Sequence, residues 1–273
     1  MSVVNSNIKA LIASQAMLVS ERSLGKAMTQ LSTGKRINSA SDDAAGLAIS
    51  NKLGTQIRSL NQAVRNANDA VSMIQTADGA AEGITNLLIR MRELAVQATN
   101  GTNSTSDKTA LQSEFSSLQS EITRISDKTT WNGVALIGAD ASATAFQIGP
   151  ESGSESQLTV TFKDLNSGVS FATAVATTTS ATATTTITHI DDAISALDVF
   201  RSDLGARINR LTHAADNLTQ VAINSAASRS RIADTDYAQT TSELARAQIV
   251  RQAGTAMLAQ ANQQPAFVLA LLR

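Results

Sequence analysis

The chain has 273 residues, enough to bury the core of one large or two ordinary domains, and 42% of them are hydrophobic whereas only 3% are aromatic. Its formal net charge of −1 gives no electrostatic footprint for nucleic acid or an anionic membrane, and we expect neither as a partner. The absence of cysteine excludes disulfides and thiolate metal sites. We identify no signal peptide and no run of about 18 apolar residues, so no membrane span is expected.

Near the start of the chain, apolar residues recur every seven positions. They are Ala10, Met17, Leu24 and Leu31. This narrow stripe predicts a helix with too little apolar area to be stable alone.

Residues 33–43 form a linker between this stripe and the long helix that follows. Gly34 supplies a break in the helix. Good N-cap residues for a helix starting near residue 44 are Asn38, Ser39, Ser41 and Asp42. Asp42 and Asp43 also place negative charge at the N-terminus of that helix, where its dipole favours it. The acidic pair could suggest metal binding or acid–base catalysis, but no further carboxylate or histidine cluster supports that reading.

From residue 44 to residue 98 the apolar positions step by three and four. They are Leu53, Ile57, Leu60, Val64, Ala67, Val71, Ile74, Ala81, Ile84, Leu88, Met91, Ala95 and Ala98. The seam predicts one helix of about 50 residues, roughly 75–80 Å long, packed lengthwise against others.

Residues 100–107 are rich in turn and N-cap residues and end this helix. A shorter helix should fold back antiparallel, with its seam at Leu111, Phe115, Leu118, Ile122 and Ile125. A second long seam follows much later, at Ile190, Ile194, Leu197, Leu204, Ile208, Leu211, Ala215, Leu218 and Ala222. Together the three seams predict a three-helix bundle built from distant parts of the chain.

Residues 131–188 lose the helical pattern and fill with Gly, Ser and Thr. Asn132-Gly133 is a turn signal, and the alternating runs at 145–148 and 157–162 predict strands or hairpins. Residues 173–188 are nearly all Ala and Thr, which favours a low-complexity surface connection.

Near the end of the chain a second narrow stripe appears before Gln264-Pro265 interrupts it. Its members are Ala245, Ile249, Ala253, Ala256 and Met257. Neither terminal helix can be stable by itself, so we expect the two to need each other and neighbouring copies of the chain.

The predicted fold class is mainly α: a long antiparallel helical bundle or coiled coil formed by both chain ends, with a small β-hairpin-rich middle. Residues 1–43 and 232–273 are predicted to form a terminal coiled coil plus linker. Residues 44–150 and 188–231 should form a helical rod with a hairpin, and residues 151–187 a short variable surface segment. The alternative is that the terminal helices simply complete one five-helix bundle.

Several long motifs resemble those of bacterial flagellins. They are LSTGKRINSASDDAAGLAI at residues 31–49, RELAVQA at 92–98, WNG at 131–133, and an ending that runs from ANQQP at 261–265 to LLR at 271–273. The departure lies in the middle, where many flagellins insert one or two outer domains. The chain therefore resembles a short flagellin.

The resemblance implies a subunit that polymerises with itself into the flagellar filament used for motility. In flagellins the terminal helices pair as an inner coiled coil that lines the channel, the long helices form the next layer, and the middle faces the medium. A contact that repeats without closing generates a helical filament. The family also implies type III export to the outside of the cell without a cleaved leader, an export chaperone that covers the apolar C-terminus, and filament cap and hook-junction proteins as partners.

In flagellins that animals detect, a Toll-like receptor docks on the long helix and its hairpin partner. The matching positions here are Arg90, Leu94 and Glu114. Folding about residues 100–106 would bring Glu114 alongside the other two, which are four apart on one helix face. The alternative is that Arg90 and Glu114 belong to a solvated charged face of the bundle.

Enzyme classes find no support in the sequence. His189 and His213 are far apart and no HExxH pattern is present, Gly34-Lys35 lacks the preceding spaced glycine of a phosphate-binding loop, and no GxGxxG follows a strand. We expect no catalytic activity, metal or cofactor. Two rival classes are the hook–filament junction protein, which shares flagellin-like ends, and a helical adhesin or secretion translocator, which would not require both terminal signatures.

Overall fold

The computed structural model describes residues 7–138, 140–162 and 183–270, and only the backbone of residues 183, 184 and 264–270. The chain divides into two compact units. One unit comprises the residues up to 57 together with those from 223 onward, and the other comprises residues 58–222. The two ends of the chain therefore belong to one unit and the long middle of the chain to another.

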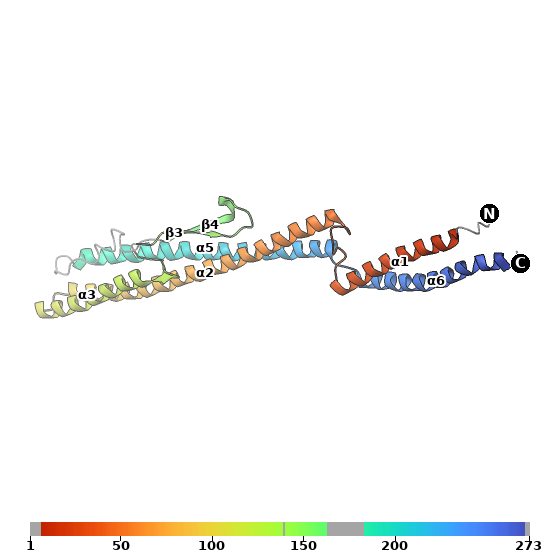
Figure 1. Cartoon of the computed structure of the whole chain (residues 1–273). Coiled ribbons are helices and arrows are strands. Elements are labelled where there is room, and N and C mark those ends of the chain that lie inside the picture. Colours follow the sequence, from red (N-terminus) through yellow and green to blue (C-terminus); the bar gives the residue numbers. More distant parts are fainter. Residues whose placement is uncertain (1–6, 139, 163–182, 271–273) are drawn as a thin grey trace. The chain divides into compact units, whose positions relative to one another are not determined.

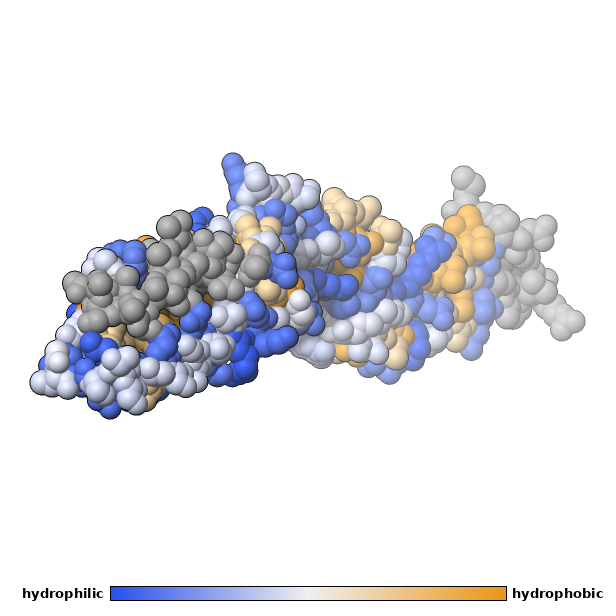
Figure 2. Space-filling model, turned by 90° about the vertical axis from the view of Figure 1, so that its left-hand side faces the viewer, coloured by the Kyte–Doolittle hydropathy of each residue, from blue (hydrophilic) through white to orange (hydrophobic). Residues whose placement is uncertain are grey.

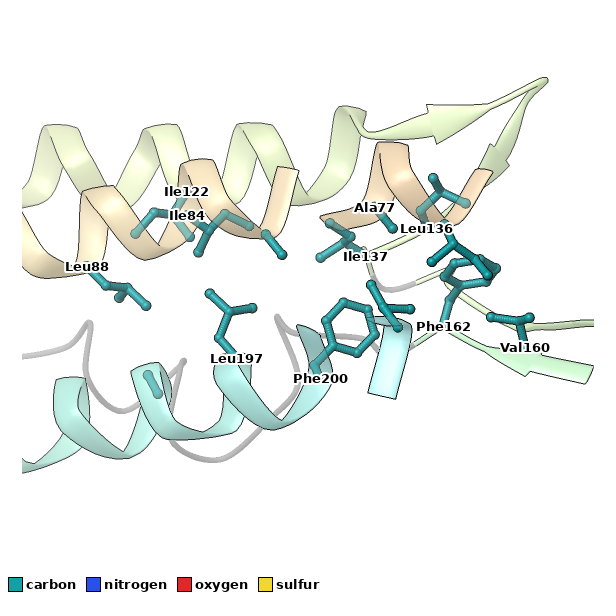
Figure 3. Packing of buried hydrophobic residues seen from close by; sticks show 14 of the residues in the cluster. Ala77, Ile84, Leu88, Ile122, Leu136, Ile137, Val160, Phe162, Leu197 and Phe200 are labelled. Atoms are coloured by element: carbon teal, nitrogen blue, oxygen red, sulfur yellow. The ribbon is translucent and has the colours of Figure 1, made fainter. Parts of the chain in front are cut away.

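Three helices run side by side in the unit of residues 58–222 (Figure 1). They are α2 (Ala44–Thr99), α3 (Thr105–Lys128) and α5 (Ala183–Ala233). The three predicted seams face one another, and their members make up most of one continuous buried cluster. Figure 3 shows how Ile84 and Leu88 of α2 point toward Ile122 of α3 and Leu197 of α5. Burying each such side chain contributes roughly 1.5–3 kcal/mol.

A tight turn separates α2 from α3, as the sequence predicts. Ser104 is the N-cap of α3: its hydroxyl accepts a hydrogen bond from the backbone N–H of Asp107, and the Asp107 carboxylate accepts one from the Ser104 backbone. This reciprocal capping box satisfies donors that the first turn of a helix leaves free. The turn therefore fixes where α3 begins.

Two small hairpins follow α3. The first pairs β1 (Thr130–Trp131) with β2 (Val134–Ala135), and the intervening turn has positive φ at both Asn132 and Gly133. Such φ values match a two-residue hairpin turn, for which Asn-Gly is the preferred sequence. The hairpin leads into Leu136 and Ile137, whose side chains are fully buried in the helical core.

The second hairpin pairs β3 (Ala143–Gln147) with β4 (Gln157–Thr161), and the short 3-10 helix η1 (Ser154–Ser156) precedes β4. Alternate β4 residues Leu158 and Val160 are buried, and Phe162 continues the same side. Figure 3 shows Val160 and Phe162 beside Phe200 of α5. The predicted alternation is thus confirmed, and it covers one flank of the helices.

The start of α5 corrects the sequence analysis. The stretch 173–188 was expected to be a surface connection, yet α5 already begins at Ala183; residues 163–182 lie outside the described part. Thr186 is buried and Ile187 packs against the core, so the helical stripe continues backward from Ile190. The run of threonines hides this stripe because it lowers both helix propensity and apolarity.

Ion pairs on the bundle surface tie neighbouring helices together. Arg92 of α2 pairs with Asp191 of α5 at 2.6 Å, and Arg201 of α5 pairs with Asp78 of α2 at 2.8 Å. The Arg92–Asp191 pair is exposed, so its contribution to the free energy of unfolding is small. Both pairs are satisfied in only one antiparallel register of α2 and α5, which is the register observed.

The other unit contains α1 (Ile8–Thr33) and α6 (Tyr237–Ala270), which lie antiparallel and in contact (Figure 1). Here Pro265 was expected to interrupt the C-terminal stripe, but α6 continues through it to Ala270. Proline removes one backbone donor from a helix without necessarily ending it, and the acceptor left free has another partner, described below.

Candidate functional site

The contact between α1 and α6 is a narrow seam with the spacing of a coiled coil. On α1 the partly or fully buried positions are Ala10, Ala13, Met17, Ser20, Leu24, Ala27, Gln30 and Leu31. On α6 they are Thr240, Leu244, Ala247, Gly254, Leu258 and Ala261. The steps of three and four, with one step of seven on α6 between Ala247 and Gly254, match the a and d positions of heptads. The seam is built largely from small residues, so the two backbones approach closely.

Met17 and Gly254 show how tight the seam is. A Cβ atom on Gly254 would lie 2.9 Å from the Met17 Cγ, so the methionine occupies the space that a larger residue would need. Further along, the Ser20 hydroxyl donates to the Ala247 carbonyl oxygen at 3.1 Å, which satisfies a buried polar group. The pair is therefore well fitted but buries little apolar area.

Large apolar side chains remain exposed on the outside of the terminal pair. They are Ile8, Leu11, Ile12, Leu18, Val19 and Met28 on α1, and Ile249, Val250 and Met257 on α6. Figure 2 shows apolar surface next to the grey terminal residues. A single copy thus leaves these large apolar side chains of α1 and α6 exposed to solvent, which marks an interaction surface.

The predicted polymerisation residues separate into two groups. Ala10, Met17, Leu24 and Leu31 of α1 face α6. The α6 residues Ala245, Ile249, Ala253 and Met257 are exposed, and α6 uses a different face against α1. Sequence reasoning missed that face because Thr240 and Gly254 do not register as members of an apolar stripe.

Asn7 joins the two ends of the chain. Its side-chain oxygen accepts from the Ala10 backbone N–H and caps α1, while its Nδ2 donates to the Ala261 carbonyl oxygen at 2.8 Å. In a helix that carbonyl would accept from the N–H of residue 265, which is a proline and has none. The Asn7 amide therefore satisfies the acceptor that lets α6 continue through Pro265.

Replacing Asn7 by aspartate should keep the cap but lose the donor to Ala261, and weaken the pairing of the two helices by about 1–3 kcal/mol. In a Pro265→Ala background, residue 265 again supplies an N–H to Ala261, so the same substitution should have a smaller effect. Amide hydrogen exchange across residues 237–263 in the polymer, where α6 is expected to be protected, measures both losses. Equal losses in the two backgrounds would show that the Ala261 carbonyl is not the relevant acceptor.

The linker joins its C-terminal counterpart through backbone hydrogen bonds. Gly34 ends α1 in the left-handed conformation with φ 70°, as its predicted role as a break requires. Its carbonyl oxygen accepts from the Thr235 N–H at 3.0 Å, and the Arg36 N–H donates to the Ala233 carbonyl oxygen at 2.7 Å. This short antiparallel bridge holds the ends of α1 and α5 together.

Helix ends at the linker are capped by charge. The Arg36 guanidinium donates from Nε and Nη2 to the Ile232 carbonyl oxygen, which complements the C-terminus of α5. Asp43 accepts from the Gly46 N–H at 2.8 Å and caps α2. The cap is thus Asp43, which was one of the predicted linker and cap residues. The other N-cap candidates, Asn38, Ser39, Ser41 and Asp42, lie too early in the chain to reach the first turn.

Asp42 instead closes the turn of the linker. Its Oδ2 accepts from the backbone N–H groups of Asn38 and Ser39 at 3.2 and 3.1 Å, and its Oδ1 lies 3.3 Å from the Lys26 ammonium on α1. The N–H groups of Ser39 and Asn38, and then Lys26, hold the pKa of the Asp42 carboxyl below its ordinary value of 3.8. Asp42 thereby fastens the linker to α1.

Asp42 should make the stability of this region sensitive to acid. Because its folded-state pKa is depressed, its contribution is fully present above the ordinary pKa of 3.8 and is lost as the pH falls through the folded-state value. The difference in stability between the unaltered chain and an Asp42→Asn variant, measured by urea unfolding, should be constant near neutrality and shrink below pH 3.8. A difference that stays constant into acid would contradict this role.

The structure brings together two of the three predicted receptor-binding residues. The Arg90 guanidinium donates from Nε and Nη2 to Glu114 Oε1 at 3.0 and 2.9 Å, and it also pairs with Glu93. Both partners raise the pKa of Arg90 through their hydrogen bonds, and the hydrogen bond with Glu93 has the larger effect of the two. Leu94 does not join them at the surface, because its side chain is buried in the helical core.

The described residues form neither a metal site nor a membrane span. Within the described ranges no three histidine, cysteine or acidic side chains gather as a metal site would require. His213 is exposed on α5. Among the helices that the structure describes, none is long and apolar enough to cross a membrane.

Comparison with known proteins identifies the family. Residues 4–141 match the family model of the bacterial flagellin N-terminal helical region, and residues 187–272 match that of the C-terminal helical region. The chain belongs to the bacterial flagellin family. It is a structural subunit of the flagellar filament and not an enzyme, as the terminal motifs predicted, and flagellins polymerise into a filament that lies outside the cell.

Relatives match the whole chain in sequence but differ from one another in length. The chain is 45% identical to a flagellin of Halalkalibacterium halodurans over 271 residues, which is 99% of this chain and 100% of that protein. It is 33% identical to flagellin E of Vibrio cholerae, with 99% of each chain covered, over an alignment of 373 positions. The Vibrio protein therefore carries residues that this chain lacks, which confirms the short form.

Solved structures support the fold. The crystal structure of Bacillus cereus flagellin is similar with a TM-score of 0.51 and 36% identity, covering 60% of this chain and 94% of that one. A putative flagellar hook-associated protein from Vibrio parahaemolyticus reaches a TM-score of 0.60 at 14% identity, covering 71% of this chain and 100% of that one. At that identity the second likeness shows a shared fold alone.

Proposed function

We propose that this chain polymerises through the outer surface of its α1–α6 pair. The observation that carries the proposal is the apolar character of both sides of α6: Leu244 and Leu258 pack toward α1, whereas Ile249 and Met257 on the other side are 66% and 64% exposed. A helix that is apolar on opposite faces is stable only when both are covered. Neighbouring copies would supply the second cover.

The layers of the filament follow from this proposal. Residues 1–43 and 232–273 would form the inner coiled coil and linker, residues 44–150 and 188–231 the rod, and residues 151–187 the segment toward the medium. The exposed Ile249 and Met257 support an inner position for α6, where neighbouring copies surround it. The filament cap and hook-junction proteins would meet the same terminal helices at the ends of the polymer.

Electron microscopy of the purified chain with a precipitant salt or preformed filament seeds tests the proposal. Long tubular filaments are expected from the full chain, and none from a version lacking residues 236–273, which has no α6. Soluble monomers in both samples, even with seeds, would move the assignment toward a junction protein or an adhesin.

Assembly should also order the terminal helices. The narrow α1–α6 seam buries mainly small side chains, so the isolated subunit has little to hold the pair together. Amide hydrogen exchange should therefore be fast in α1 and α6 of the monomer and slow in the polymer. Termini that are equally protected in both forms would contradict this coupling.

Export requires protection of the same apolar surface before assembly. We propose that the chain leaves through the type III apparatus of the flagellum and that an export chaperone covers its C-terminal segment, whose sequence from Phe267 to Leu272 is apolar. A truncation after Gln260 should abolish chaperone binding. Binding that survives this truncation unchanged would show that the chaperone reads another segment.

A host Toll-like receptor is the second candidate partner, favoured by the Arg90–Glu114 pair on the α2–α3 surface. Arg90→Ala should reduce receptor activation without unfolding the bundle, since the side chain is exposed. Glu121→Ala, which removes the exposed Glu121–Arg124 pair on α3, is the matched control. Equal activity of the Arg90 variant and the control would leave the pair as a solvated surface contact.

A further inference from the structure

A groove of about 850 Å³ lies between α1 and α6 beside the linker. Its floor includes the small buried residues Ser20, Ala27 and Ala247. The groove changes character along its length. Away from the linker its walls are apolar, with Val19 on α1 and Val250 on α6, and toward the linker they carry charge.

The charged half of the groove holds cations without partners. Arg246 on α6 and Arg231 at the end of α5 line the groove, and neither forms an ion pair with any residue that the structure describes. Glu243 lies on the same wall, one turn before Arg246. The groove therefore offers an apolar half followed by a half that carries the unpaired Arg246 and Arg231 and three carboxylates, those of Asp234, Asp236 and Glu243. The Asp236 carboxylate is already engaged, because it accepts from the backbone N–H groups of Ala238 and Gln239.

A ridge on α1 changes from apolar to charged side chains in the same order as the groove. Leu11 and Leu18 are 67% and 48% exposed, lie seven positions apart on one face of the helix, and do not line the groove. One turn further toward the linker come Glu21 and Arg22, both exposed and without an ion pair among the described residues. Along α1 the ridge thus passes from apolar to charged, as the groove does.

We propose that the α1 ridge of one copy docks into the α1–α6 groove of the next copy. This inference rests on the proposed assembly through the terminal pair and names the two surfaces that meet. Leu11 and Leu18 would lie in the apolar half against Val19 and Val250. Glu21 would face Arg246 and Arg231, and Arg22 would face Glu243.

The direction in which α1 runs in neighbouring copies supports this pairing. Copies repeated along a filament keep an axial helix pointing the same way, so the α1 of one copy must run parallel to the α1 of the next. In that orientation the apolar and charged halves of ridge and groove coincide, whereas a reversed helix would place Leu18 among the arginines. Because ridge and groove are different surfaces, the contact is heterologous and does not close on itself.

Cross-linking tests the pairing cleanly because the chain has no cysteine. Two full-length single-cysteine variants are needed: Leu18→Cys marks the ridge and Ser23→Cys the rim of the groove. They are mixed in equal amounts, polymerised on seeds of the unaltered chain, and treated with a short bis-maleimide. Covalent dimers are expected from the mixed filaments and not from filaments of Leu18→Cys alone.

The matched control replaces Ser23→Cys by Gln248→Cys, an exposed α6 position outside the groove. Dimers that form with Gln248→Cys, or with Leu18→Cys alone, would overturn the pairing, and so would filaments that give no dimers in any mixture. If Leu18→Cys does not assemble, Leu11→Cys takes its place on the same ridge. A failure of the unaltered chain to form filaments would instead overturn the proposed function.

Discussion

Replacing Ile249 and Met257 together by aspartate is expected to abolish seeded filament growth while leaving the monomer folded. Both side chains are exposed in the single chain, so the carboxylates stay in water until a neighbouring copy covers them. Burying two unpaired charges on assembly would then cost several kcal/mol for each contact. Filament yield by sedimentation and electron microscopy measures the effect, and circular dichroism checks the monomer.

The control places the same two charges on another face of the same helix. Gln248 and Thr255 are exposed, lie seven positions apart and carry polar side chains. A Gln248→Asp, Thr255→Asp variant should still polymerise. If it fails as completely as the Ile249 and Met257 variant, net charge rather than a specific apolar face controls assembly.

Leu197→Ala should lower the free energy of unfolding of the unit of residues 58–222 by about 2–5 kcal/mol. The Leu197 side chain is fully buried between α2 and α5, so its removal leaves a cavity (Figure 3). Since the chain has two compact units, the loss should be read from probes within this unit, such as hydrogen exchange in α2 and α3. Probes at α1 and α6 should change little.

Val199→Ala is the matched control, two residues further along α5. Its side chain is 71% exposed, and alanine favours a helix more than valine does. The free energy of unfolding should therefore change by less than about 0.5 kcal/mol. A loss as large as that of Leu197→Ala would mean that Val199 is covered in a way this structure does not show.

Local sequence was sufficient to predict the helical elements and the hairpins. Apolar steps of three and four can only share one face in a helix, so the seam through Ile84 and Leu88 specified α2 without knowledge of its partner. Asn132-Gly133 likewise specified a turn, because both residues adopt positive φ. The family motifs at the two ends added the filament function.

The start of α5 and the N-cap of α2 were harder to predict from the sequence. Thr186 is buried although threonine disfavours helices, and only this burial in the folded chain reveals that it belongs to the buried stripe. Asp43 rather than its earlier neighbours caps α2, since a cap depends on the path of the linker and not on residue type alone. The burial of Leu94 was also hard to predict, because it depends on how the helices pack against one another.

The sequence by itself predicted that both ends are helical, which the structure confirms, and that neither is stable alone, which stays a prediction. Only the tertiary structure decided which face of α6 meets α1, and it chose the side of Thr240 and Gly254 over the more apolar side of Ile249. It also revealed the bond from Asn7 to Ala261, whose partners are 254 positions apart. Periodicity reports which residues share a face, whereas the partner of that face depends on backbone approach and on groups distant in the chain.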